Sequence, residues 1–298
     1  MAIKQSLVLV IDDDETNRFL LQSYLENSGY QAAIKKNGKV AWKYLQNGAP
    51  EISAILLDKM MPEMDGLEFL KLIKSHDEFE DIPVIMQTGV SDNNSIREGI
   101  SAGAYYYLTK PFKEQTVLSI VNAAVKDFEK YKTLCEEAEK NKLTASSLQN
   151  SRFELKTIEE ANAISALLAS AYPDPDNVVS GISELILNAI EHGNLEINYT
   201  EKTTLCSSDN LNDEITKRLN DETYKDRKIT IDFIRSEKKL SLTISDEGKG
   251  FDWRPYIELT PDRVYDSHGR GIALAALSFD SIEYNKKGNS VTCTVKTN

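Results

Sequence analysis

LVLVIDDDETNRFLLQSYLENSG, residues 7–29, joins an apolar run to three acids and then to a helical pattern. The run at 7–11 is short, rich in Val, and typical of a strand buried on both faces. The residues after Asp14 place apolar side chains at helical spacing. We therefore expect a strand that is followed directly by Asp12 and Asp13, and then a helix.

The same alternation continues through the first 126 residues. Apolar runs recur at 52–57, 83–86 and 105–108, with a weaker one at 31–36, and helical patterns lie between them. This order predicts an α/β domain of the doubly wound (βα)5 type, in which a parallel sheet has helices on both faces. Ligands bind at the carboxyl ends of the strands in such sheets, and the side chains expected there are Asp12, Asp13, Asp58, Thr88 and Lys110.

These residue types suit phosphoryl chemistry. Three converging carboxylates repel one another and have raised pKa values unless a cation lies among them, and carboxylate oxygens suit octahedral Mg²⁺. One carboxylate can then attack a phosphoryl group, with Thr88 and Lys110 stabilising its oxygens. The alternative is that each acid simply caps the helix after it, but five polar positions at one sheet edge argue against this alternative.

Four motifs in this region, VLVIDDDETNR, LLDKMMPEMDG, MQTG and YLTKPF, resemble those of response-regulator receiver domains over residues 1–126. The resemblance implies that Asp58 is the phosphoacceptor and that a sensor histidine kinase is the phosphodonor. It also implies an Mg²⁺ site formed by Asp12, Asp13, Asp58 and the Met60 carbonyl. Pro111 would follow a cis peptide bond.

The resemblance further implies a conformational switch. Thr88 and Lys110 are its polar pair, and Tyr107 is the aromatic residue expected to turn inward when Thr88 moves toward the phosphoryl group. Tyr105 and Tyr106 stand where the family often has acids. We interpret these two tyrosines as contact surface for a dimer or for the second domain.

Apolar residues after Phe112 follow steps of four and three, the seam of a coiled coil, at Val117, Val121, Ala124, Phe128, Tyr131, Cys135 and Ala138. We therefore expect a helical linker over 127–150 that pairs two copies into a homodimer. About three heptads are few, so a single helix packed on its own chain stays open as the alternative. The histidines, His76, His192 and His268, lie outside this linker, which disfavours a kinase that phosphorylates its own histidine.

Residues 184–194, ELILNAIEHGN, carry the main pattern of the second domain. Glu184, Asn188 and Glu191 recur at i, i+4 and i+7, so they form one polar stripe on an otherwise apolar helix, capped near Asp174 or Asp176. The buried stripe of this helix would contain Val179, Ile182, Ile186 and Ala189. Alternating strand patterns and two glycine-rich turns, DEGKG and HGRGI, follow further along the chain.

A glycine turn before a helix is a weak pattern alone, although free N–H groups at such a turn bind phosphate. The polar stripe, DEGKGF and HGRGI in that order are specific. They resemble the nucleotide-binding boxes of the GHKL ATPase superfamily, an α/β sandwich, over residues 151–298. ELILNAIEHGN and the step from RGI into a helix most resemble the anti-sigma-factor serine kinases.

This second resemblance implies that the domain binds ATP with Mg²⁺. Asn188 would ligate the ion, and Glu184 would accept the proton of an attacking serine hydroxyl or orient water. Asp246 would accept the adenine amino group, and the lid would contain Gly248, Gly250, Gly269, Gly271 and the phosphate clamp Arg270. Glu191 and His192 have less defined roles, since a solvated Glu and a helix-end His are equally good interpretations.

The composition of the chain restricts the class of protein, its partners and its location. The chain has 298 residues, 41% of them hydrophobic, and a net charge of -12 without a dense Lys/Arg stripe, so we expect a globular protein with no nucleic-acid partner. Three distant cysteines, Cys135, Cys206 and Cys293, indicate reduced thiols in a cytoplasmic protein. No segment has the length expected of a membrane span.

These features predict a response regulator, phosphorylated on Asp58, whose output domain is a serine/threonine kinase of the anti-sigma-factor type. Its target would be an anti-sigma-factor antagonist or a similar protein. The alternative is an ATP-dependent module that sequesters its partner without transferring phosphate. A polar stretch at 200–226 is longer than a simple connection, and it would cover the nucleotide lid, contact the receiver or recognise a partner.

Overall fold

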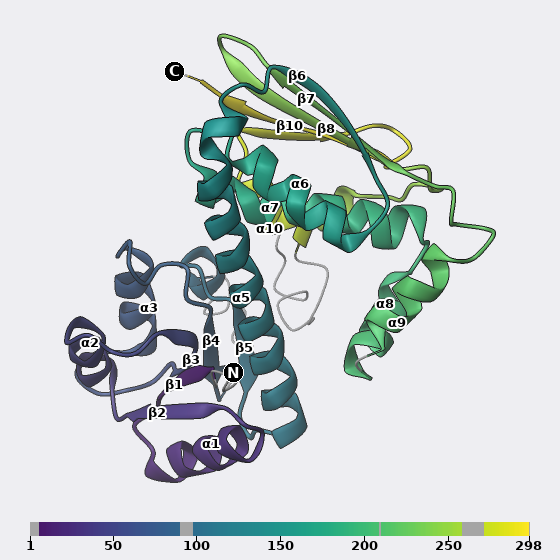
Figure 1. The fold of residues 1–298 in the computed structure, drawn as a ribbon. Helices are drawn as coiled ribbons and strands as arrows, with labels where there is room; N and C mark the ends of the chain where they lie inside the picture. The colour runs from purple at the N-terminus through teal and green to yellow at the C-terminus, as the bar shows by residue number, and fades with distance from the viewer. Residues whose placement is uncertain (1–5, 90–97, 209, 258–270, 298) are drawn as a thin grey trace. The chain divides into compact units, whose positions relative to one another are not determined.

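The computed structural model describes residues 6–89, 98–208, 210–257 and 271–297. The chain forms two compact units, the first ending at Lys130 and the second beginning at Tyr131. Each unit has its own sheet and its own hydrophobic core (Figure 1).

A five-stranded parallel sheet lies at the centre of the N-terminal unit. Its strand order is β2-β1-β3-β4-β5, so the chain winds first to one side of β1 and then to the other. The strands are β1 (Leu7–Ile11), β2 (Gln31–Lys35), β3 (Ile52–Asp58), β4 (Val84–Thr88) and β5 (Tyr106–Thr109). Every residue of β3 is buried, as expected of a central strand covered on both faces.

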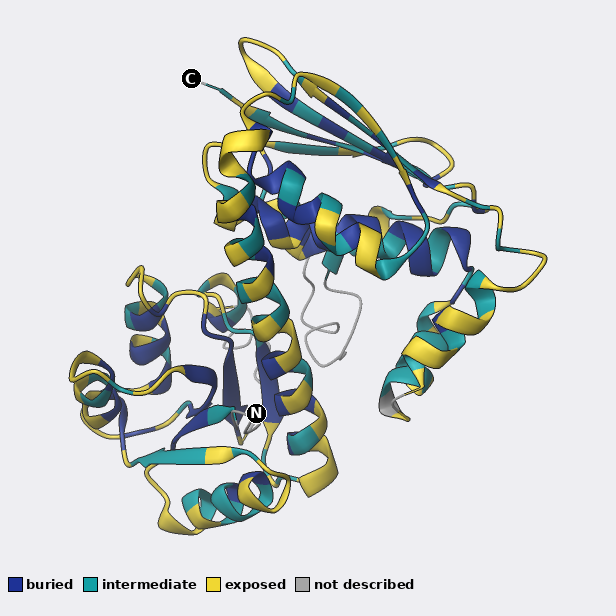
Figure 2. Ribbon diagram, viewed as in Figure 1, coloured by how far each residue is buried: buried dark blue, intermediate teal, exposed yellow. Residues whose placement is uncertain are grey.

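Helices cover both faces of this sheet, and the buried residues of Figure 2 line the surfaces between the layers. One face packs against α1 (Glu15–Asn27) and the first part of α5 (Glu114–Ala145), and the other against α2 (Gly38–Gln46) and α3 (Gly66–Lys74). A capping box between Asp65 and Glu68 begins α3 shortly after Asp58. The predicted doubly wound α/β fold is confirmed.

Tyr106 is buried inside the N-terminal unit, so its interpretation as contact surface is wrong, whereas Tyr105 is half-buried and the same interpretation stays a prediction for it. Tyr106 is 7% exposed and packs in the core that α5 covers. The Tyr105 hydroxyl donates to Asp127 Oδ2 of α5 at 2.5 Å.

α5 is one continuous helix of 32 residues that contributes side chains to both units. Val117, Val121 and Ala124 are buried in the N-terminal core, whereas Leu134 and Ala138 are buried in the C-terminal core. Much of the predicted coiled-coil seam therefore packs on its own chain, as in the alternative interpretation. When a helix buries one face against a globular core, its apolar residues recur at steps of three and four, as they do in a coiled coil.

An antiparallel sheet of five strands, in the order β6-β7-β8-β10-β9, forms one layer of the C-terminal unit. The strands are β6 (Asn150–Leu155), β7 (Ile229–Arg235), β8 (Lys239–Ser245), β9 (Ser281–Tyr284) and β10 (Ser290–Lys296). Alternate residues of β7 and β8 are buried, because only one face of the sheet is packed. That face is covered by α6 (Ile158–Ala169), α7 (Pro175–Asn188) and α10 (Gly271–Leu277), which confirms the α/β sandwich.

α7 carries the polar stripe of the sequence pattern. Asp174 is its N-cap and Pro175 lies in its first turn. The predicted apolar stripe is buried, at most 9% exposed, at Val179, Ile182, Ile186 and Ala189. After Asn188 the helix widens into a π-helix, η1 (Ala189–Asn194), which the sequence pattern did not predict. π-helical turns of this kind are rare and frequently mark functional sites.

The polar stretch at 200–226 contains most of α8 (Tyr199–Ser207) and all of α9 (Leu211–Leu219). The helical pattern of NDEITKRLNDETYKD, residues 212–226, predicts the second of these helices but not the first. Ile215 of α9 is buried in the C-terminal core. A short 3-10 turn, η2 (Arg254–Tyr256), follows the DEGKG turn. In the described part of the chain, no helix combines the length and the apolar character that crossing a lipid bilayer requires.

Candidate functional sites

An acidic cluster lies at the carboxyl end of the parallel sheet. Asp12 and Asp13 follow β1, and Asp58 is the last residue of β3, so two adjacent strands bring the three carboxylates together. Their ligand oxygens lie within 4.8 Å of one another, and Asp12 and Asp58 are buried while Asp13 is exposed. This spacing and donor set suit a hard divalent cation that keeps part of its water shell.

Lys110 places a positive charge on this cluster. Its Nζ lies 2.6 Å from Asp58 Oδ1 and 2.9 Å from Asp12 Oδ2. The Lys110–Pro111 peptide bond is cis, and the main-chain N–H of Lys110 donates to the Thr88 carbonyl at 2.8 Å. Burial raises the pKa of Asp58; Lys110 opposes that shift, and the neighbouring carboxylates add to it.

Two residues that the sequence analysis did not single out hold Asp12 in place. Asn17 Nδ2 donates to Asp12 Oδ2 at 3.2 Å, and Arg18 Nη1 donates to the Asp12 carbonyl at 2.7 Å. Both residues belong to the first turns of α1, which Asp14 caps. The start of α1 therefore positions the acid at the end of β1.

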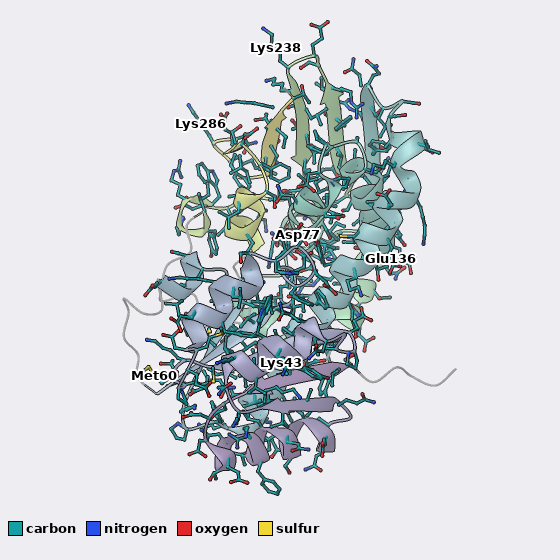
Figure 3. All side chains as sticks on the ribbon, turned by 90° about the vertical axis from the view of Figure 1, so that its left-hand side faces the viewer. Lys43, Met60, Asp77, Glu136, Lys238 and Lys286 are labelled. Atoms are coloured by element: carbon teal, nitrogen blue, oxygen red, sulfur yellow. The ribbon has the colours of Figure 1, made fainter. Side chains whose placement is uncertain are left out.

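The other residues predicted for this site have different environments. Thr88 ends β4 and is 7% exposed, whereas Met60 is 73% exposed and its side chain lies at the surface (Figure 3). Tyr107 is 2% exposed and already points inward. A Cβ added to Gly99 would lie 1.5 Å from the Tyr107 hydroxyl oxygen, so the missing side chain of Gly99 makes room for this inward position.

A second polar group lies on α7 against the start of α10. Glu184 and Asn188 are half-buried and one helical turn apart, on one face of α7. A Cβ added to Gly271 would lie 2.2 Å from Glu184 Oε2 and 3.6 Å from Asn188 Nδ2. The absence of a side chain at Gly271 therefore lets α10 approach both polar groups closely.

Asp246, just after β8, lies in a cradle of glycines. The Gly248 N–H donates to Asp246 Oδ1 at 2.8 Å, and a Cβ added to Gly193 would lie 2.4 Å from Asp246 Cγ. Gly250 has a φ of 78°, a conformation that glycine adopts without strain. Asn289 Nδ2 donates to the Asp246 carbonyl at 2.9 Å, so the hairpin before β10 holds the same turn.

Burial raises the pKa of Asp246 to about 6. The Gly248 N–H and the positive charges of Lys287 and Arg227 oppose this shift without cancelling it. A carboxyl whose pKa is strongly shifted by burial is a frequent feature of ligand sites.

Glu191 and His192 are more constrained than a solvated side chain would be. Glu191 is 5% exposed, and its Oε2 lies 2.6 Å from Nζ of Lys202 on α8. His192 Nδ1 lies 2.5 Å from the Ile197 carbonyl oxygen, and burial lowers the pKa of this histidine. Glu191 is half of a buried ion pair, so its interpretation as a solvated residue is wrong.

Residues 142–295, more than half of the chain, match the family model of the histidine kinase-like ATPase domain. The chain belongs to the histidine kinase-like ATPase family. Residues 8–122 match the response regulator receiver domain, so this family member carries a receiver domain before its ATPase domain. The predicted combination of the two domains is confirmed.

Several known proteins are similar to this ATPase family member. The 3',5'-cyclic-nucleotide phosphodiesterase regA of Dictyostelium discoideum is 29% identical over 189 residues, which are 60% of this chain and 24% of regA. The transcriptional regulatory protein SrrA of Staphylococcus aureus is 32% identical over 119 residues, 40% of this chain and 47% of SrrA. The chain thus spans less than half of either relative. The signal receiver domain of a signal transduction histidine kinase from Syntrophus aciditrophicus is 30% identical, with a TM-score of 0.38 over 41% of this chain and 90% of that one.

ATP with Mg²⁺ is the ligand that the histidine kinase-like ATPase family implies, and the residues present fit it. The side-chain-free surface of Gly193 and Gly248 around Asp246 suits a flat base with an amino group. Asn188 offers an oxygen that adds no negative charge beside phosphates. When bound, Mg²⁺ offsets the negative charge of phosphoryl oxygens. It would be held by Asn188 in the ATPase domain and by Asp12, Asp13 and Asp58 in the receiver domain.

We expect the affinity of the ATPase domain for adenosine to fall as the pH drops through about 6. The family resemblance implies that ionised Asp246 would accept a hydrogen bond from the adenine amino group. Its raised pKa means that the carboxyl is neutralised at a higher pH than an ordinary aspartate. Dissociation constants measured between about pH 5 and pH 8 check this, and adenosine has no phosphates that titrate in the same range. A constant affinity across this range would contradict the role given to Asp246.

Sequence reasoning missed several residues of the ATPase site. Asn194 Oδ1 accepts from the Glu247 N–H at 2.9 Å, and Lys287 Nζ donates to the Gly248 carbonyl at 2.9 Å. Gly193 was visible inside ELILNAIEHGN, next to the polar stripe, whereas Lys287 has no fixed spacing from any motif. Two residues predicted for the lid, Gly269 and Arg270, lie outside the described residues.

Proposed function

We propose that phosphorylation of the receiver domain on Asp58 controls a protein serine/threonine kinase activity of the ATPase domain. A response regulator with an ATP-binding output follows from the two families that the chain matches. The observation that carries the kinase proposal is the position of Glu184, one turn before Asn188 and against Gly271 at the start of α10. A site that only binds nucleotide does not require a carboxylate there.

In the receiver domain, a carboxylate oxygen of Asp58 attacks the phosphorus of a phosphohistidine on a sensor histidine kinase. An O–P bond forms, the P–N bond breaks, and the imidazole leaves with the electron pair and takes up a proton. Lys110 Nζ, 2.6 Å from Asp58, is placed to stabilise an oxygen of the transferred group. Thr88 then moves toward the transferred group while Tyr107 keeps the inward position that it already has, and α5 transmits the change because it contributes to both cores.

In the ATPase domain, Glu184 accepts the proton of a serine or threonine hydroxyl on a partner protein. The hydroxyl oxygen attacks the γ-phosphorus of ATP, the bond to the bridging oxygen breaks, and ADP leaves. Asn188 would contribute an oxygen ligand for the metal ion, and Asp246 would hold the adenine amino group. The resemblance to anti-sigma-factor serine kinases supports an anti-sigma-factor antagonist, or a similar protein, as the partner.

A second candidate function is an ATP-dependent module that sequesters a partner without transferring phosphate. α9 favours this function, because its exposed positions add surface that ATP binding alone does not require. Pairing of two copies through the linker helix stays a prediction, and the mass of the protein in solution, with and without phosphorylation, checks it.

The deciding experiment is transfer of labelled γ-phosphate from ATP, with Mg²⁺, to a candidate anti-sigma-factor antagonist from the same genome. We expect acid-stable label on a serine or threonine of the partner, and none when the ATPase protein is omitted. An ATP-dependent complex with the partner that never acquires label would favour sequestration. A protein that binds no ATP would contradict both functions.

A further inference from the structure

Lys202 brings a positive charge from α8 to the polar stripe of α7 and η1. Its Nζ lies 2.6 Å from Glu191 Oε2, and its side chain is 18% exposed. Burial alone would lower the pKa of Lys202, but the charges of Glu191 and Glu184 raise it above its usual value. Lys202 is therefore a charged ammonium in direct contact with Glu191, three residues after Asn188.

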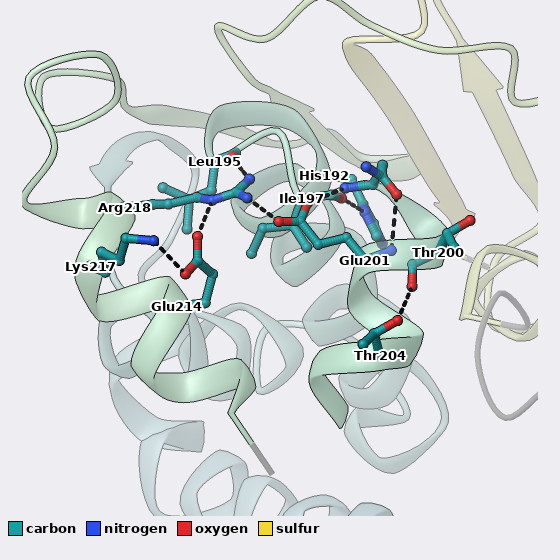
Figure 4. A network of polar contacts seen from close by, with 10 residues as sticks. His192, Leu195, Ile197, Thr200, Glu201, Thr204, Glu214, Lys217 and Arg218 are labelled. Carbon is teal, nitrogen blue, oxygen red and sulfur yellow. Dashed lines mark hydrogen bonds and ion pairs between the residues drawn. The ribbon is translucent and has the colours of Figure 1, made fainter. Parts of the chain in front are cut away.

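The surrounding fold holds Lys202 in this position. α8 begins with a capping box in which Glu201 takes part. Arg218 of α9 contacts Glu201 and donates to the Leu195 carbonyl, just after η1, at 2.8 Å (Figure 4). Ile215 anchors α9 in the core of the same unit. The helix that carries Lys202 is thus tied to the segment that carries Glu191.

The polar stripe has an unfavourable charge for a polyphosphate. Glu184 and Glu191 have the same sign as the phosphates, and Asn188 contributes no charge. Like charges within a protein repel more strongly than they do in water. A cation beside the two carboxylates reduces this repulsion, and its effect increases with the charge of the ligand.

We propose that Lys202 determines nucleotide specificity: its ammonium offsets Glu184 and Glu191 and so favours ATP over ADP. The inference rests on the proposed nucleotide binding at α7 and extends it to a residue eleven positions after Glu191, outside the ELILNAIEHGN motif. It also assigns a role to α8, which is then part of the nucleotide site.

A purely structural ion pair is the competing explanation. Such a pair would neutralise Glu191 and leave the relative affinities for ATP and ADP unchanged. Stability by itself is a weak reason for a buried ion pair, because apolar replacements of such pairs are often tolerated. The two explanations differ in what they predict for ligands of different charge.

The test compares dissociation constants of ATP, ADP and adenosine, all with Mg²⁺, for the full chain and for Lys202→Met. We expect this substitution to weaken ATP binding about tenfold, ADP binding less, and adenosine binding hardly at all, because the Coulomb energy scales with ligand charge. Lys217→Met is the matched control, since Lys217 lies on α9 with a side chain 73% exposed. It should leave all three constants unchanged.

Two further variants keep the test decisive if Lys202→Met folds poorly. Lys202→Arg retains the charge and should retain the preference for ATP. Glu191→Gln removes one carboxylate and leaves Lys202 in place, so the preference for ATP over ADP should increase. Thermal unfolding without nucleotide, measured on each variant, reports separately on any structural role of the pair.

The inference would be overturned if Lys202→Met weakened the binding of ATP and ADP equally, or if Glu191→Gln left the preference for ATP over ADP unchanged. Lys202 and Glu191 would then form a purely structural ion pair. Absence of nucleotide binding in the unsubstituted chain would instead overturn the proposed function. The two failures are therefore distinguishable.

Discussion

Asp58→Asn is expected to abolish phosphorylation of the receiver domain by a small acyl phosphate such as acetyl phosphate. The amide has the size of the carboxylate but lacks its nucleophilic oxygen. Asp58 is buried at the end of β3, and Lys110 Nζ lies 2.6 Å from its Oδ1, where it can stabilise an oxygen of the transferred group. Intact mass, measured before and after incubation with the donor and Mg²⁺, gives the fraction phosphorylated.

The control for this substitution is Asp14→Asn. Asp14 also follows β1 but caps α1, with its side chain accepting from the Thr16 and Asn17 N–H groups. Phosphorylation should persist in this variant. An undiminished phosphorylated fraction in Asp58→Asn would show that another residue is the phosphoacceptor.

Glu184→Gln is expected to lower phosphate transfer to a partner by about 10²- to 10⁴-fold, the usual contribution of a general base. The glutamine keeps the volume against Gly271, where the space is tight enough that a Cβ would overlap Glu184 Oε2. Binding of ATP should therefore persist, because Asn188 and Asp246 are unchanged. Initial rates of label transfer and the dissociation constant of ATP, measured on the same preparation, separate the two effects.

Glu159→Gln is the matched control for this second prediction, because Glu159 is exposed in the first turn of α6 in the same unit. It should transfer phosphate at the unsubstituted rate. Transfer that is equally fast in Glu184→Gln would mean that Glu184 is not the base, and the carboxylate would then have only a positioning role.

The convergence of the receiver residues could be predicted from the sequence because topology alone brings them together. In a parallel sheet the carboxyl ends of neighbouring strands meet at one edge, so Asp12 and Asp58 needed only the correct strand assignment. Asn17 and Arg18 were missed, since their contacts depend on side-chain directions at the start of α1.

The ATPase site was predicted less completely for three physical reasons. The π-helical turn of η1 breaks the regular spacing that a helical pattern assumes, so the direction of Glu191 could not be read from its position. Lys202 comes from a helix whose apolar spacing is weak, and α8 was not predicted. The cradle of Asp246 depends on contacts between Gly193 and a turn more than fifty residues later.

The heptad spacing of α5 was ambiguous for a different reason. A stripe at steps of three and four residues shows that one face of a helix is buried, but it does not identify what buries that face. Val121 and Ala138 satisfy the same pattern and belong to different cores. The sequence predicts that this stripe is buried, but only the three-dimensional structure shows which residues bury it.

Because α5 contributes side chains to both domains, it restricts where one output domain can be exchanged for another. Phe128 still packs with the receiver core, and Tyr131 already packs with the ATPase core, so Glu129 and Lys130 are the residues between the two. A fusion point before Phe128 would remove apolar α5 side chains that pack on the receiver core. A fusion point after Tyr131 would remove α5 side chains that pack on the ATPase core. Exchange that preserves both domains is thus confined to less than one turn in the middle of a helix, rather than to a tolerant loop.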